Sequence, residues 1–95
     1  MSQLPDRLTH ATGLEVHETQ DGLVVFDPKT DRVHHLNGTA AVLFELCDGS
    51  RDTTDLPTFV AVLFSLDEPP AEAVDDGLHQ LMEQGVVVQA QAKNS

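Results

Sequence analysis

Two adjacent histidines, His34 and His35, are the first residues of this 95-residue chain to suggest chemistry, because imidazole binds metals and transfers protons. They lie in a run that is typical of a β-strand, and neighbouring residues of a strand point to opposite faces. One ion therefore cannot bind both without distortion, and His17 would add only one more ligand. The pattern favours a strand surface over a metal site, and we expect no metal or other cofactor.

The other reactive side chains do not have the spacing of an active site. Cys47 falls on the apolar stripe of a predicted helix, which is typical of a small buried hydrophobe, and a single cysteine excludes an intrachain disulfide. The acidic run EAVDDG (72–77) lacks the ligand spacing of a calcium loop and is typical of a solvated helix face. No Ser–His–Asp spacing and no glycine-rich phosphate loop stands out. The sequence therefore predicts a protein that is not an enzyme.

Charge is the strongest feature of the composition. Sixteen Asp and Glu residues against five Lys and Arg give a formal net charge of −11 at pH 7. Such a chain repels phosphate backbones, so we expect no nucleic-acid partner. No apolar run approaches the roughly 20 residues of a membrane span, and the N-terminus lacks the apolar region of a signal peptide. We therefore expect no membrane partner and a cytoplasmic location.

Three strand patterns come first along the chain. LEVHET (14–19) alternates as a half-buried strand does, and LVVFD (23–27) is apolar on both faces, as a central strand is. RVHHL (32–36) follows a turn at Pro28 and is expected to be the edge strand. Short connections between them predict a three-stranded antiparallel β-meander.

Three helical patterns and one short strand follow. The Asn37 side chain is expected to cap the first helix, and Gly49 is expected to end it in a left-handed conformation. The predicted helices lie between Gly38 and Gly49, between Thr53 and Asp67, and between Pro70 and Gly85. Val86 to Val88 are expected to pair as a strand. The fold class is therefore α+β, with a meander followed by three α-helices.

The length fits one compact domain, which we expect over residues 12–89. Residues 1–11 are polar and without periodicity, which predicts a flexible N-terminal arm. Residues 90–95 are expected to be a frayed C-terminal tail.

The predicted edge strand offers a binding surface that needs no reactive side chain. An edge exposes unpaired amides and carbonyls, and an extended peptide can add to it as a further strand. If the third helix lies beside this edge, a groove forms between them. The alternative on physical grounds is an idle edge of a small winged-helix domain.

The run HHLNGTAAVLFELCDGSR, residues 34–51, resembles the signature of PqqD-like proteins, which are also called recognition elements for the precursors of ribosomally made, modified peptides (RiPPs). The similarity extends over about residues 13–88. The residues that carry it are Leu36, Asn37, Ala40, Ala41, Leu43, Leu46, Cys47, Asp48 and Gly49.

This resemblance implies a winged helix-turn-helix fold that no longer binds DNA. Members of the PqqD-like family hold the leader segment of a precursor peptide as an additional strand, which pairs with the third strand of the sheet and is flanked by the third helix. They present it to a modifying enzyme, such as a radical SAM protein, a protease or cyclase of lasso-peptide assembly, or a dehydratase. By position, the implied peptide-binding residues are Arg32, Val33, His34, His35, Leu36, Asp75, Leu78, His79 and Met82. The alternative function is a winged-helix DNA-binding transcriptional regulator, which would need a basic third helix where this one is acidic.

Overall fold

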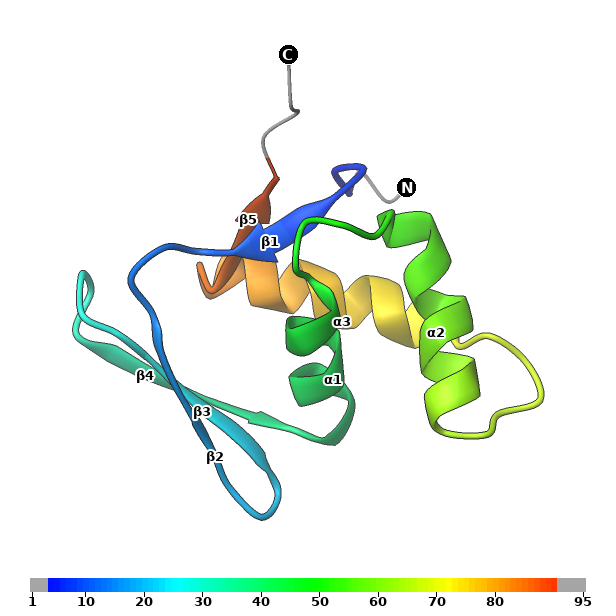
Figure 1. Cartoon of the computed structure of the whole chain (residues 1–95), viewed down its shortest axis with the longest axis horizontal. Coiled ribbons are helices and arrows are strands. Elements are labelled where there is room, and N and C mark those ends of the chain that lie inside the picture. Colours follow the sequence, from blue (N-terminus) through cyan, green and yellow to red (C-terminus); the bar gives the residue numbers. More distant parts are fainter. Residues whose placement is uncertain (1–3, 91–95) are drawn as a thin grey trace.

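The computed structural model describes residues 4–90 and confirms the α+β class (Figure 1). In chain order its elements are β1 (Leu8–His10), β2 (Glu15–Glu18), β3 (Gly22–Asp27), β4 (Arg32–Asn37), α1 (Gly38–Leu46), the 3-10 turn η1 (Thr53–Asp55), α2 (Leu56–Leu63), α3 (Ala71–Glu83) and β5 (Val87–Gln89).

The predicted meander is confirmed as a three-stranded antiparallel sheet in the order β2-β3-β4. Leu23 and Val25 of the central strand point into the core, and Val24 and Phe26, which alternate with them, are half-buried. The prediction of a half-buried first strand is wrong, since all four residues of β2 are exposed. Helix α1 packs against β3 and β4, while β2 lies at the far edge of the sheet.

A second sheet, not predicted in full from the sequence, joins the two ends of the described chain. β1 pairs antiparallel with β5, and Leu8 of β1 is only 1% exposed. The expectation of a flexible arm is therefore wrong for residues 8–10, whereas the expected short strand near residue 87 is confirmed. A three-residue strand is too short to show the alternation that reveals strands in a sequence. Residues 1–3 of the expected arm and 91–95 of the expected tail lie outside the described residues.

The ends of α1 differ in detail from the prediction. The Asn37 side chain makes no capping hydrogen bond, and the Gly38 amide instead donates to the Asp21 carbonyl at 3.2 Å, which extends the sheet ladder to the first helical residue. The helix ends at Leu46 rather than next to Gly49. Gly49 has a φ of +87°, and its amide donates to the Leu8 carbonyl at 2.9 Å, so this glycine anchors β1.

One hydrophobic core connects the helices to both sheets. The His10 ring of β1 stacks on Phe44 of α1 with 3.9 Å between ring centroids. Helices α1 and α3 approach closely at Gly77, where an added Cβ would lie 2.7 Å from Leu43 Cδ1. The most deeply buried side chains are those of Leu8, Val25, Leu43, Phe44, Cys47, Leu56, Val60, Val74, Leu78, Leu81, Val86 and Val87. The N-terminal strand is thus part of the core.

We predict that Leu8→Ala lowers the free energy of unfolding by about 2–5 kcal/mol, because it removes a fully buried side chain and leaves a cavity. Urea denaturation followed by circular dichroism measures this loss. Val88→Ala is the matched control, since Val88 lies on β5 but is 44% exposed, and it should change the stability by no more than about 0.5 kcal/mol. Equal effects of the two substitutions would show that β1 does not contribute to the core in solution.

Candidate functional site

Strand β4 has a partner on one side only. It pairs with β3 over residues 32–37, and no other strand of the described chain pairs with its second edge. Half of its backbone amides and carbonyls therefore lack a strand partner. Which half it is depends on the hydrogen-bonding phase of the β3–β4 ladder.

The hydrogen bond from Gly38 to the Asp21 carbonyl sets this phase. It lies in register with the β3–β4 pairs, which match Leu23 with Leu36 and Val25 with His34. Hydrogen-bonded and non-hydrogen-bonded pairs alternate in an antiparallel ladder. Counting back from Gly38, the even-numbered residues of β4 bond to β3. The outward-facing backbone groups are those of Val33, His35 and Asn37.

The opposite edge of β3 gives the same phase independently. The Thr19 amide donates to the Gly22 carbonyl at 2.9 Å, and this pair lies in register with β2–β3. By the same alternation, Val24 and Phe26 direct their backbone groups toward β2. The odd-numbered residues of β3 are therefore left to bond with β4, in agreement with the first count.

The side chains of β4 divide between the two faces of the sheet. Val33, which is 51% exposed, and His35 lie on the outer face, in register with Phe26 and Val24. Leu36 lies in the core, only 4% exposed. His34 is half-buried, and its Nε2 is a buried atom without a hydrogen-bond partner in the described part of the protein. The two histidines thus have different environments and do not converge.

A groove of about 730 Å³ lies between α1 and α3 and begins two residues after β4 ends. Of the α3 residues implied by the resemblance, His79 lines it. The groove residues that sequence reasoning missed are Thr39, Ala40, Leu43, Ala73, Asp76, Gly77, Gln80 and Glu83. The spacing of Asp76, Gln80 and Glu83 along one helix face is the signal that could have identified them.

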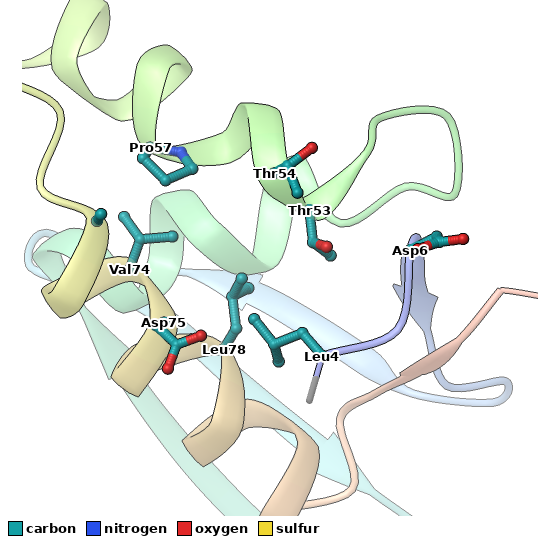
Figure 2. A pocket seen from close by; sticks show the side chains of 9 residues that line it. Leu4, Asp6, Thr53, Thr54, Pro57, Val74, Asp75 and Leu78 are labelled. Atoms are coloured by element: carbon teal, nitrogen blue, oxygen red, sulfur yellow. The ribbon is translucent and has the colours of Figure 1, made fainter. Parts of the chain in front are cut away.

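The other implied α3 residues do not line this groove. Leu78 is fully buried, and Met82 is partly buried against the core. Asp75 lies 3.6 Å from His79 as an i, i+4 pair. Asp75 and Leu78 line a separate pocket of about 360 Å³, which also involves Leu4 and Pro57 (Figure 2). The structure therefore distributes these α3 residues between the groove, the core and a second hollow.

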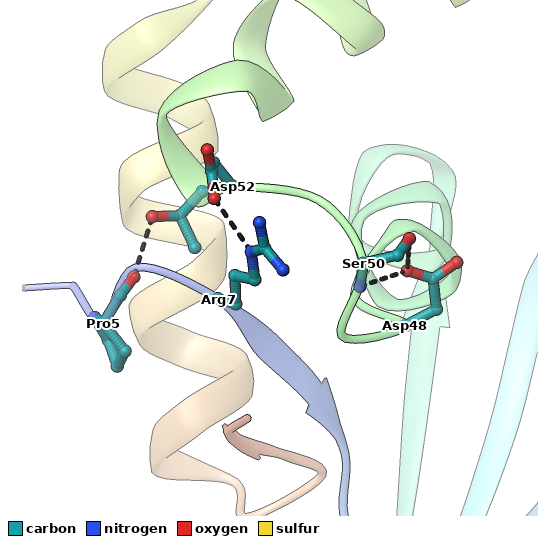
Figure 3. A network of polar contacts seen from close by, with 6 residues as sticks. Pro5, Arg7, Asp48, Ser50 and Asp52 are labelled. Carbon is teal, nitrogen blue, oxygen red and sulfur yellow. Dashed lines mark hydrogen bonds and ion pairs between the residues drawn. The ribbon is translucent and has the colours of Figure 1, made fainter. Parts of the chain in front are cut away.

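The Cys-Asp-Gly segment after α1 is a structural turn. Asp48 accepts hydrogen bonds from the Ser50 hydroxyl at 2.6 Å and from the Ser50 amide at 3.0 Å (Figure 3). It also accepts one from Arg51 at 2.9 Å. The bonds from Ser50, with a smaller effect of Arg51, lower the pKa of Asp48 to about 2. Burial of Cys47, with a smaller effect of the Asp48 charge, raises the pKa of its thiol to about 12. The thiol is protonated at neutral pH and unsuited to nucleophilic chemistry.

The described residues, 4–90, contain no group of three or more His, Cys, Asp or Glu side chains arranged to hold a metal ion. Within the same residues, no helix has the length and apolar character needed to cross a membrane.

The comparison with protein families identifies one match. The model of the family described as Coenzyme PQQ synthesis protein D (PqqD) matches residues 22–87, which include β3, β4 and all three α-helices. No curated protein and no solved structure gives a significant match.

We predict an alternating pattern of amide exchange along β4 in the unliganded protein. The amides of Val33 and His35 should exchange rapidly, while those of His34 and Leu36 should be slower by at least about tenfold, because only the latter bond to β3. Hydrogen–deuterium exchange read by NMR resolves the four amides separately. The opposite alternation would show that the ladder phase is reversed.

We also predict that Cys47 makes the stability fall at alkaline pH. The folded-state pKa is raised from 9.0 to about 12, so the stabilisation is complete below pH 9.0 and is lost as the pH rises toward 12. Urea denaturation across this range should show a steeper loss for the wild type than for Cys47→Ala. Parallel slopes would mean that the thiol ionises equally well in the folded protein.

Proposed function

Because this chain belongs to the PqqD family, we propose that it binds the leader segment of a ribosomally made precursor peptide and presents it to a modifying enzyme, without catalysing a reaction itself. Members of the PqqD family bind a precursor peptide and work with biosynthetic enzymes. The observation that carries the proposal is the row of outward-facing backbone groups at Val33, His35 and Asn37.

In the proposed complex the peptide adds to β4 as a fourth strand of the β2-β3-β4 sheet. Val33 and His35 each offer one amide and one carbonyl, so that the peptide backbone supplies affinity independent of its sequence. Alternate peptide side chains lie on the outer face, beside the Val33 and His35 side chains, and on the opposite face of the sheet. The groove between α1 and α3, which begins two residues after β4 ends, offers further contacts to the peptide. The side chains of the peptide supply the selectivity.

The buried residues of the implied site have a supporting role in this complex. Leu36 anchors β4 in the core, and Leu78 anchors α3 in it. Arg32 is exposed at the start of β4, while His79 lines the groove beside Asp75. Met82 packs partly against the core at the C-terminal end of α3.

We further propose that the fold is a winged helix-turn-helix, with the β3–β4 hairpin as the wing, and that the protein works in the cytoplasm, where precursor peptides are made. The partner enzyme in this proposal is a radical SAM protein, a lasso-peptide protease or cyclase, or a dehydratase. A DNA-binding regulator is disfavoured by α3, which carries Glu72, Asp75, Asp76 and Glu83 and no Lys or Arg. Duplex phosphates would meet this acidic face and a net charge of −11.

We predict that His35→Pro reduces the affinity for a leader peptide at least about tenfold, because proline removes an outward-facing donor and places its ring in the path of the added strand. His35→Ala retains the backbone and should cost about 0.5 kcal/mol or less. The probe is the synthetic leader segment of a short precursor peptide chosen from the neighbouring genes, titrated by calorimetry, with an expected wild-type Kd in the micromolar range or better.

The matched substitution His34→Pro separates binding from folding. It removes a bond of the β3–β4 ladder, so thermal unfolding should show a destabilised protein, whereas His35→Pro should unfold near the wild-type temperature. Wild-type affinity in a folded His35→Pro variant would rule out strand addition on β4.

A further inference from the structure

Helix α2 and the residues after it present an exposed apolar surface. Five of the eight large apolar side chains that are exposed in the described chain lie within residues 59–66. Val62 is 72% exposed and Leu63 is 59% exposed. We call this surface the α2 face; it consists of Phe59, Val62, Leu63, Phe64 and Leu66. Apolar side chains gathered in this way on a protein surface are typical of interaction sites, whereas scattered ones are not.

The α2 face contains no charge of its own and has an acidic border. Residues 56–66 include no Asp, Glu, Lys or Arg, in a chain with 22% charged residues. Asp55 precedes this run, and Asp67 and Glu68 follow it; all three are exposed and have no ion-pair partner among residues 4–90. Arg51, a cation at this border, lies 5.2 Å from the Phe59 ring centroid and already pairs with Asp48.

A hollow beside the α2 face also combines apolar and acidic side chains. Its volume is about 320 Å³, and it lies between α1 and the turn that joins β2 to β3. Phe64, at the C-terminal end of α2, lines this hollow, so the hollow adjoins the α2 face at that residue. Its acidic lining residues are Glu18, Asp21 and Glu45. A partner that covers the α2 face therefore meets carboxylates at this border as well.

We propose that the α2 face docks a protein surface that has an apolar centre and a rim of Lys and Arg side chains. The inference rests on the proposed function, in which this partner is the modifying enzyme. Burial of the uncharged centre desolvates no ion, and the carboxylates around it select a basic rim and steer its approach. The groove between α1 and α3 contains no residue of 56–66, so the peptide and the partner occupy different surfaces.

The same charges argue against two other occupants. A second copy of this chain would bring a second acidic border and another net charge of −11 to the interface. An anionic membrane surface would meet the same repulsion. A basic-rimmed protein surface is the occupant that both the apolar centre and its border favour.

The test uses the full-length 15N-labelled chain and two synthetic amphipathic helices. One has a leucine face flanked by lysines, and its twin carries glutamate at every lysine position. The lysine helix should shift the amides of residues 55–68, bind at least tenfold more tightly than its twin, and weaken with added salt. Val62→Asp should reduce its affinity at least tenfold. Val88→Asp is the matched control, exposed at 44% on β5, and should bind as the wild type does.

Other results would overturn the inference. These are equal binding of the two helices, shifts located away from residues 55–68, a dimer in sedimentation analysis that Val62→Asp dissociates, or binding to anionic phosphatidylserine vesicles that depends on Val62. Binding of the leader peptide is followed separately, through the amide shifts of residues 32–37. The peptide should bind Val62→Asp with the same affinity as the wild type. Its failure to shift those amides would contradict the proposed function and would leave the helix titration interpretable.

Discussion

The antiparallel ladder between β3 and β4 is the constraint on which the rest of the structure depends. Its register places Leu23, Val25 and Leu36 in the core and turns alternate backbone groups of β4 away from β3. The ladder extends to Gly38, so the first residue of α1 is fixed by the sheet rather than by a side-chain cap. A change of one residue in register would move every side chain of β4 to the other face and reverse the outward-facing amides.

The segment after α1 has a structural role that its residue types conceal. Cysteine, aspartate and glycine in succession suggest chemistry, yet Cys47 is buried and protonated, and Asp48 is used within its own turn. The Gly49 amide binds the Leu8 carbonyl and so positions β1. Nearby, Arg7 pairs with Asp52 at 2.9 Å, and the Thr53 hydroxyl donates to the Pro5 carbonyl at 2.8 Å (Figure 3). The segment holds the N-terminal residues onto the domain.

The two proposed interfaces differ in the physical basis of recognition. The edge of β4 offers directional backbone hydrogen bonds, which accept many sequences and leave selectivity to side chains in the groove. The α2 face offers non-directional apolar contact, and the carboxylates at its border restrict the partner by charge. A small domain that binds two ligands at once benefits from this separation, because the two sets of contacts do not compete for the same residues.

The sequence by itself determined the α+β class, the order of the three meander strands and three α-helices, the edge position of β4 and the acidic surface, because periodicity and composition act locally. It predicted a buried Cys47 from the stripe of one helix, and the motif around it indicated the family. The sequence did not predict the pairing of β1 with β5, because three residues are too few to show the alternation of a strand and the partner strand lies at the other end of the described chain. The exposure of β2, the separation of Leu78 from the groove and the outward direction of the Val33 and His35 backbone groups were decided only by tertiary structure. These features depend on which elements pack together and on the phase of a hydrogen-bond ladder. The residue pattern of a single segment encodes neither the packing nor the phase.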